Sequence, residues 1–456
     1  MLEILKTANN LLYSYLVIAV LIGGGLYFTI RTKGVQFRLF KDSCRLLFKS
    51  NDGTVKEEEK HVSSFQAFAV SLASRVGTGN LVGVATAIVL GGPGSVFWMW
   101  VTALLGAATG FMEATLAQLY KRKDKDSFIG GPAYYIESGL GKRWMAVLSA
   151  ILIIFTFALG YTLVQCNTIG SAFENQFGFN HVLVGAILAF ALILIIFGGI
   201  QRIAKVSSVI VSIMVVGYFL LALVIVCMNI KLVPHVFETI VYSAFGIRQA
   251  AGGLTGAAIM HGVRRGLFSN EAGLGSAPNA AATAYVSHPV KQGLVQSLGV
   301  IIDTLVTCSC TAFIILISPV DISGGQGIGI ELTQAALTSQ VGDWGSIFVT
   351  IALFFFAFST VIGTYYYGEA NLRFFTKKNW TLTVFRIVVA GTAFLGTCIS
   401  LEQAWELTDI CTGIAGLINI IALFILSPKV ITLLDDYQRQ RKAGIKDPTY
   451  PDWWSH

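Results

Sequence analysis

Charged residues are scarce in this chain. Asp, Glu, Lys and Arg make up 12% of its 456 residues, whereas 54% are hydrophobic. Proline is also rare, with 9 residues against 47 glycines. No soluble domain has this balance. Apolar runs of about 20 residues, the length that crosses a bilayer, recur along the whole chain, so the composition predicts a membrane protein.

Catalytic and metal-binding signatures are missing as well. The sequence has no His-Glu-x-x-His, no Gly-x-Ser-x-Gly and no phosphate-binding loop. Its seven cysteines fall almost wholly inside the apolar runs, and Cys308 and Cys310 have no histidine or further cysteine at ligand spacing. An enzyme is therefore unsupported, and we expect the cysteines to be small packing residues.

Eleven apolar runs are long enough to be transmembrane helices, which predicts an all-α polytopic protein. They lie near 11–30, 64–90, 94–120, 143–172, 180–199, 205–231, 250–286, 290–318, 343–372, 380–401 and 405–427. Lysines and arginines gather in alternate loops and in the C-terminal tail. By the positive-inside rule these segments are cytoplasmic, which places the N-terminus outside the cell and the C-terminus inside. The net charge of +7 thus reflects topology and not nucleic-acid binding.

The second run is interrupted by glycines and polar residues. Within 71–81 it carries Arg75 and the sequence Gly-Thr-Gly-Asn at 77–80. In lipid an unsatisfied peptide group costs several kcal/mol, so unwound backbone survives only where protein, ions or a solute satisfy it. We therefore expect a broken helix here that forms a solute site.

The seventh run contains a similar interruption at 264–278, with Arg265, Asn270 and Glu271 among small residues. The two breaks lie five runs apart, in the second and the seventh, and because five is odd the second set of helices is inverted in the membrane relative to the first. Paired interrupted helices in inverted halves indicate the central site of a transporter. The domains expected are an extra N-terminal helix at 11–30, repeats over 64–231 and 250–427, and a cytoplasmic tail over 428–456.

A broken helix provides for both a zwitterion and a cation. Free N–H groups at the start of its second half attract a carboxylate, and free carbonyls at the end of its first half suit a small hard cation or an ammonium group. Two such helices predict an amino-acid symporter coupled to Na⁺. An ion channel is the competing class, but it would show a repeated pore-lining filter and this chain has one central break in each half.

Four blocks of sequence resemble the alanine or glycine:cation symporter family, also called sodium:alanine symporters. They lie at 77–80, 91–106, 268–278 and 365–369, in the family's order, and Ser95 departs from the small glycine or alanine that the family usually has. The likeness covers nearly the whole chain. It implies the five-plus-five inverted-repeat (LeuT-like) fold and uptake of a small neutral amino acid with Na⁺, or with H⁺ as the alternative.

The resemblance also implies a substrate site. The backbone of Gly77, Thr78 and Gly79 would meet the substrate carboxylate, and Asn80 would fix the turn or coordinate a cation. Gln165 would reach the substrate with a neutral amide. The alternatives are close helix packing at Gly79 and a helix–helix contact at Gln165. The matching block of the second break adds Phe268 and Asn270.

For the cation, the resemblance implies the carbonyls of Ala73 and Val76 facing the hydroxyls of Ser359 and Thr360. The alternative is that both hydroxyls bond to carbonyls of their own helix. Thr364 stands where alanine-selective relatives tend to carry tryptophan, which implies room for a larger neutral substrate such as glutamine. The expected partners are the amino acid, Na⁺ and membrane lipid, with the chain acting as a monomer in the cell membrane.

Ionisable residues inside the runs are costly and usually have partners. We expect them to form gating or structural ion pairs, although the sequence leaves the pairings open. They are Arg75, Glu113, Arg265, Glu271, Asp303 and Glu369.

Overall fold

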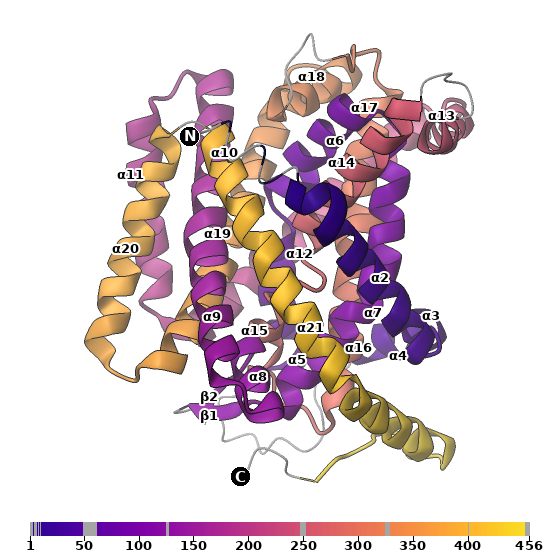
Figure 1. Cartoon of the computed structure of the whole chain (residues 1–456). Coiled ribbons are helices and arrows are strands. Elements are labelled where there is room, and N and C mark those ends of the chain that lie inside the picture. Colours follow the sequence, from indigo (N-terminus) through magenta and orange to yellow (C-terminus); the bar gives the residue numbers. More distant parts are fainter. Residues whose placement is uncertain are drawn as a thin grey trace.

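The computed structural model of the protein is almost entirely α-helical (Figure 1). It describes residues 3, 7, 9, 11–48, 62–124, 127–246, 252–323, 329–399 and 401–451. Seven helices in this part of the chain are long and apolar enough to cross a membrane, or eight when one bent pair counts as a single span. The chain is therefore a multi-pass helical membrane protein.

The seven candidate spans coincide with runs expected from the sequence, and two of them join α-helical segments through a π-helical stretch. They are α7 (Ser95–Leu119), α9 (Arg143–Ile153) with η3 (Ile154–Tyr161) and α10 (Thr162–Phe177), α12 (Gly199–Met228), α16 (Pro289–Ile301) with η4 (Ile302–Cys308) and α17 (Ser309–Ile317), α19 (Trp344–Phe375), α20 (Asn379–Cys398), and α21 (Leu401–Lys442) from Thr408 onward.

Two further runs form apolar helices that are shorter than a typical span. These are α2 (Ile18–Arg31), which continues the π-helical η1 (Leu12–Val17), and α11 (His181–Ile196). The count of eleven spans therefore stays a prediction. On length and composition the described helices support seven or eight.

The expected break in the second run is confirmed. Helix α5 (Ser64–Arg75) begins with a capping box between Ser63 and Gln66 and ends at Arg75. After a bend at Val76 and Gly77 the chain continues through the π-helical η2 (Gly79–Gly83) into α6 (Val84–Gly91), and the two halves are bent by 48°.

The seventh run is also interrupted where the sequence indicated. Helix α14 (Gly252–Asn270) ends at Asn270, and the short α15 (Ala277–Ala281) follows after six residues. Within this gap Glu271 has a φ of 56°, which is uncommon for a residue that is not glycine. The surrounding structure therefore holds the backbone of Glu271 in a sparsely populated, left-handed conformation.

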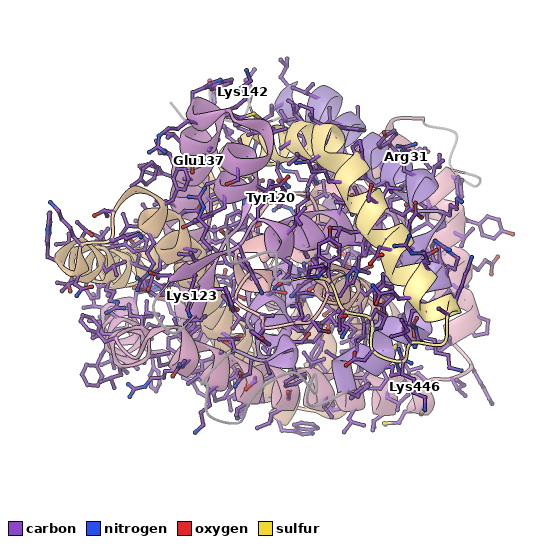
Figure 2. All side chains as sticks on the ribbon, turned by 90° about the horizontal axis from the view of Figure 1, so that it is seen from below. Arg31, Tyr120, Lys123, Glu137, Lys142 and Lys446 are labelled. Carbon is purple, nitrogen blue, oxygen red and sulfur yellow. The ribbon has the colours of Figure 1, made fainter. Side chains whose placement is uncertain are left out.

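Short elements mark the two ends of the molecule. The lower end in Figure 1 carries α3 (Val35–Arg38), α4 (Phe40–Phe48), α8 (Pro132–Leu140) and the antiparallel pair β1 (Arg122–Asp124) and β2 (Ser127–Ile129), and the upper end carries α13 (Val233–Phe245) and α18 (Ile330–Val341). Figure 2 shows Arg31, Lys123, Lys142 and Lys446 on the face seen from below. These four basic residues, from four segments of the chain, therefore share one end. The rest of the first basic loop, 49–61, lies outside the described residues.

The C-terminal segment packs against the lower end of α16. Helix α21 passes through Pro428 and continues to Lys442, after which the backbone N–H of Tyr450 donates to the Ser287 carbonyl at 2.8 Å. The ring of His288 lies against those of Tyr437 and Tyr450, with centroids 5.3 and 5.5 Å away. Part of the expected tail thus continues the last helix. Residues 452–456 lie outside the described residues.

Candidate functional site

The unwound turn after α5 has its N–H groups occupied by side-chain amides. The backbone N–H of Gly77 donates to Asn80 Oδ1 at 2.9 Å, and that of Thr78 donates to Gln165 Oε1 at 3.0 Å. Both acceptors are neutral oxygens. A carboxylate is a stronger acceptor, because hydrogen bonds to ionised groups are about twice as strong as neutral ones. Both N–H groups of the turn are therefore satisfied by neutral side-chain oxygens.

The carbonyl side of the same break surrounds one hydroxyl. Thr360 Oγ1 on α19 lies 2.9 Å from the Ala73 carbonyl oxygen, 3.3 Å from that of Val76 and 3.0 Å from that of Phe356. The first two carbonyls come from the end of α5, and the third comes from the helix that carries Thr360. Three of the four expected cation-site residues thus meet at one point.

Ser359, the fourth expected residue, makes a different contact. Its hydroxyl donates to the Phe356 carbonyl at 2.9 Å, within its own helix. This is the local bond that hydroxyls often form in membrane helices. Thr364, one turn beyond Thr360, likewise donates to the carbonyls of Thr360 and Val361 at 2.8 and 3.3 Å.

The two glycines of the turn face different surroundings. A Cβ added at Gly77 would lie 2.3 Å from Thr360 Oγ1 and 2.9 Å from Gln165 Oε1, which is too close for any side chain. A Cβ at Gly79 would instead lie 3.0 Å from the Cα of Ser269, against the backbone of α14. The missing side chain at Gly77 therefore leaves room for Thr360 and Gln165. The missing side chain at Gly79 lets the two interrupted helices approach each other.

Aromatic rings cover the second interrupted helix beside this turn. Phe268 stacks on Tyr161 with centroids 4.5 Å apart, and Trp405 packs on its ring at 4.4 Å. The Tyr161 hydroxyl also donates to the Phe268 carbonyl at 3.3 Å. Sequence reasoning missed Tyr161 and Trp405. Tyr161 had a usable signal, because it precedes Gln165 by four residues and so shares its helix face.

A carboxylate joins the two interrupted helices. Asp303, on η4, accepts from Asn80 Nδ2 at 2.8 Å through Oδ1 and from the Ser269 hydroxyl at 2.8 Å through Oδ2. Thr304 donates to the same carboxylate at 3.0 Å and accepts from Asn270 Nδ2 at 3.3 Å. Asn270 thus reaches the cluster through Thr304, while its Oδ1 accepts from the Ala272 N–H at 3.0 Å.

All twelve expected site residues are buried, and none of the ten that are not glycine exceeds 4% exposure. The centre of the molecule is therefore closed to solvent. A cavity of about 940 Å³ lies elsewhere, at the lower end, where Tyr120, Lys429 and Tyr450 are among its lining residues. Figure 2 labels Tyr120 on that face. None of the twelve expected site residues is among those lining this cavity.

The structure supplies pairings that the sequence left open. Between the C-terminal part of α14 and the N-terminal part of α21, Arg264 and Arg265 lie 2.5 and 3.4 Å from Asp409 Oδ2. Arg265 also lies 4.4 Å over the Trp405 ring. This ionic layer therefore sits next to the aromatic cover of Phe268.

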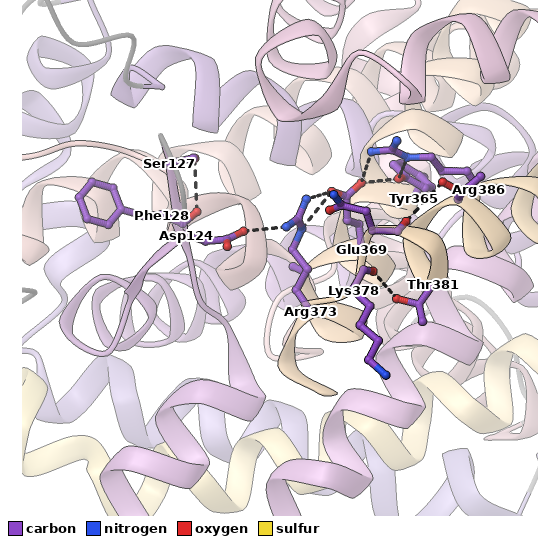
Figure 3. Close-up of polar contacts among 12 residues, drawn as sticks. Asp124, Ser127, Phe128, Tyr365, Glu369, Arg373, Lys378, Thr381 and Arg386 are labelled. Carbon is purple, nitrogen blue, oxygen red and sulfur yellow. Dashed lines mark hydrogen bonds and ion pairs between the residues drawn. The ribbon is translucent and has the colours of Figure 1, made fainter. Parts of the chain in front are cut away.

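A second ionic group lies near the lower end of α19 (Figure 3). Glu369 pairs with Arg373 at 3.0 Å and with Arg386 at 3.6 Å, and Arg373 reaches Asp124 in β1 at 2.9 Å. Tyr365 donates to the same glutamate. The group ties α19 to α20 and to the β1–β2 hairpin.

Long apolar helices, a span that unwinds at its centre and polar groups sealed around that break define a membrane transporter. The fold matches that of a mutant form of a manganese transporter of Eremococcus coleocola with a TM-score of 0.52 at 14% identity, over 88% of this chain and 85% of that one.

The chain belongs to the sodium:alanine symporter family, whose model matches residues 1–451. It is 50% identical to the probable sodium/glutamine symporter GlnT of Bacillus subtilis, over 98% of this chain and 93% of the relative. It is 48% identical to the amino-acid carrier protein AlsT of the same organism, over 98% and 94%. The resemblance drawn from the four sequence blocks is thus confirmed. The chain is a transporter of the sodium-coupled amino-acid symporter class and not an enzyme.

Proposed function

We propose that this protein imports a small neutral amino acid across the cell membrane together with Na⁺, by alternating access. The observation that carries the proposal is the group of carbonyls around Thr360 Oγ1. A hydroxyl has one proton and cannot satisfy three carbonyl oxygens at once. The same oxygens, with the hydroxyl itself, form the uncharged set of hard ligands that a small cation accepts.

The substrate site lies on the other side of the same turn. The N–H groups of Gly77 and Thr78 take the substrate carboxylate, which displaces the amide oxygens of Asn80 and Gln165. Gly79, Phe268 and Asn270 shape the site from the contact between the two interrupted helices.

Glutamine is included in the proposed substrate range, beside alanine, glycine and serine. Thr364 takes less space than tryptophan would at the same position, and a relative 50% identical to this chain carries the name of a glutamine symporter. Competition by each of these amino acids tests this range.

The proposal includes the finer architecture. Eleven spans form an extra helix at 11–30 and two inverted repeats over 64–231 and 250–427, in which α5–η2–α6 corresponds to α14–α15. The end that carries the basic residues of Figure 2 is cytoplasmic, so the N-terminus lies outside and the tail over 428–456 inside. The protein acts as a monomer, because a single chain contains both interrupted helices.

Uptake of labelled amino acids into liposomes tests the function, with an imposed gradient of Na⁺, of K⁺, of choline or of protons. We expect uptake only with Na⁺. Thr360→Val keeps the shape of the side chain and removes its oxygen, so the Na⁺ concentration for half-maximal uptake should rise about tenfold, which corresponds to about 1.4 kcal/mol. Ser359→Ala is the matched control and should change this concentration much less, because that hydroxyl bonds within its own helix.

Several outcomes would contradict the proposal. Uptake driven by a proton gradient without Na⁺ would replace it with the H⁺-coupled alternative. Flux that follows the gradient of an ion without an amino acid would indicate a channel. An unchanged Na⁺ requirement in a well-folded Thr360→Val protein would remove the cation from this position.

A further inference from the structure

The buried centre of the protein holds more negative than positive groups. Glu113, Glu271 and Asp303 are all fully buried there, and the cationic group whose charge acts on each of them is Arg75. Ionised, the three carboxylates and one guanidinium would leave an excess of two negative charges. Such an excess is very costly inside a membrane, so protons or bound cations must offset it.

The three carboxylates differ in what surrounds them. Glu113 accepts from the backbone N–H groups of Gly273 and Gly275 and from Asn419. All three of these contacts come from N–H donors, and none comes from a hydroxyl. Glu113 therefore supports the unwound backbone of the second break.

Glu271 sits inside the second break. It accepts from the hydroxyls of Ser74 and Ser276 at 2.6 to 2.8 Å. Ser74 is the penultimate residue of α5, so this carboxylate links the lower half of one interrupted helix to the gap in the other.

Asp303 has oxygen atoms around it that come from different elements. Ser269 on α14 and Thr304 beside it each present a hydroxyl oxygen within 3.0 Å of its carboxylate. Asn80, in the turn after α5, contacts both its carboxylate and its backbone carbonyl, at 2.8 and 3.3 Å. A hydroxyl that now donates to the carboxylate can turn and offer its lone pairs to a cation.

The local backbone also distinguishes Asp303. It lies in the π-helical stretch η4, within a span that is otherwise α-helical. Single π-helical turns inside α-helices are frequent at functional sites. Both interrupted helices contact this one carboxylate, through Asn80 and Ser269.

We propose that Asp303, with the hydroxyls of Ser269 and Thr304, binds a second monovalent cation, Na⁺, distinct from the one at Thr360. The proposal rests on the proposed Na⁺-coupled function. The carboxylate supplies the full charge that the neutral ligands at Thr360 lack, and the cation offsets a buried negative charge. Because its ligands belong to both interrupted helices, binding at Asp303 favours the closed arrangement in which those helices meet.

The coupling ratio tests the second site. Liposomes that contain the full-length protein are given labelled Na⁺ and labelled amino acid, and the initial fluxes of both are compared. We expect the wild type to move two Na⁺ per amino acid, with a Hill coefficient for Na⁺ above 1 and at most about 2. Asp303→Asn should move one, with a Hill coefficient of about 1.

Glu113→Gln is the matched control. It removes one buried carboxylate charge from the same region but none of the proposed oxygen ligands, and we expect it to keep the ratio of two. Should Asp303→Asn fail to fold, Ser269→Ala takes its place. That variant should need several-fold more Na⁺ for half-maximal uptake and lose cooperativity.

The outcomes that overturn the second site are distinct from those that overturn the function. One Na⁺ per amino acid in the wild type refutes the second site alone, whereas no Na⁺-driven uptake refutes the proposed function. An unchanged ratio in Asp303→Asn with a raised KM for the amino acid would assign Asp303 to the substrate ammonium group. Proton uptake that disappears in this variant, with one Na⁺ in the wild type, would assign it to a proton.

Discussion

Gly77 and Gly79 are two residues apart, yet their missing side chains serve different purposes. At Gly77 the space that a Cβ would take is occupied by Thr360 Oγ1 and by the amide of Gln165. At Gly79 it is occupied by the backbone of α14. The first glycine therefore bears on the chemistry of the site and the second on the approach of two helices. This distinction decides which of them a transport assay should test.

Gly77→Ala should impair Na⁺ use more than it impairs folding. Its methyl group would push Thr360 away from the carbonyls of Ala73 and Val76. Overpacking of this kind costs about 1–3 kcal/mol. We therefore expect the Na⁺ concentration for half-maximal uptake to rise about tenfold or more, since about 1.4 kcal/mol corresponds to tenfold.

Gly83→Ala provides the control for this change, because a Cβ there has no neighbour closer than 3.9 Å. Its uptake and melting temperature should stay near those of the wild type. Equal Na⁺ dependence in the two variants would contradict the role given to Gly77.

At the scale of elements, the contact between α14 and α21 closes the upper side of the site. Arg264 and Arg265 project from α14 to Asp409 on α21, and Arg265 covers Trp405, which in turn packs on Phe268. Separation of these two helices must break a buried ion pair and a ring contact together. The ion pair and the ring contact therefore stabilise only the arrangement in which α14 and α21 lie against each other.

Asp409→Asn should lower thermal stability strongly. Asp409 is 1% exposed, and its loss would leave two buried guanidinium groups without their shared carboxylate. Removal of one partner from a buried pair typically costs about 3–5 kcal/mol. Glu406→Gln is a milder change, because Glu406 is more exposed and lies 3.7 Å from Arg264. Melting curves in detergent compare the two, and equal losses would argue against the ionic layer.

At the scale of the whole molecule, hydrophobicity and glycine placement predicted the helical membrane fold and the unwound turn at 77–80. The encounter of Ala73 and Val76 with Thr360 came from the family resemblance, since these residues lie almost 290 positions apart in the sequence. The pairing of Arg264 with Asp409 could not be predicted, because no local pattern indicates which distant helix supplies a counter-charge. Nor could the extent of α21, because a proline usually suggests a helix end and this helix passes through Pro428.

The docked C-terminal segment should make stability depend on pH. Burial lowers the pKa of His288 from 6.5 to about 4, against the opposing effect of Asp436. Between these values the unfolded imidazole binds a proton and the folded one does not, so stability is lost as the pH falls from 6.5 toward 4. At pH 5 the loss is on the order of 2 kcal/mol.

His288→Asn checks this pH effect. Asparagine cannot titrate in this range and can still cap α16, as His288 does by accepting from the Val290 N–H. The difference in melting temperature between pH 7 and pH 5 should be smaller in the variant than in the wild type. An identical difference would show that other groups cause the acid sensitivity.

The amide oxygens of Asn80 and Gln165 that hold the N–H groups of Gly77 and Thr78 bear on the return half of the proposed cycle. A carrier that has released its cargo inside the cell must reorient empty before it can load again. Because these two N–H groups are already satisfied by the protein's own side chains, the empty carrier leaves neither of them unpaired as it crosses back. The substrate must then displace these amides in every transport cycle. Because the displacement costs part of its binding free energy, we expect fast turnover at the expense of tight binding.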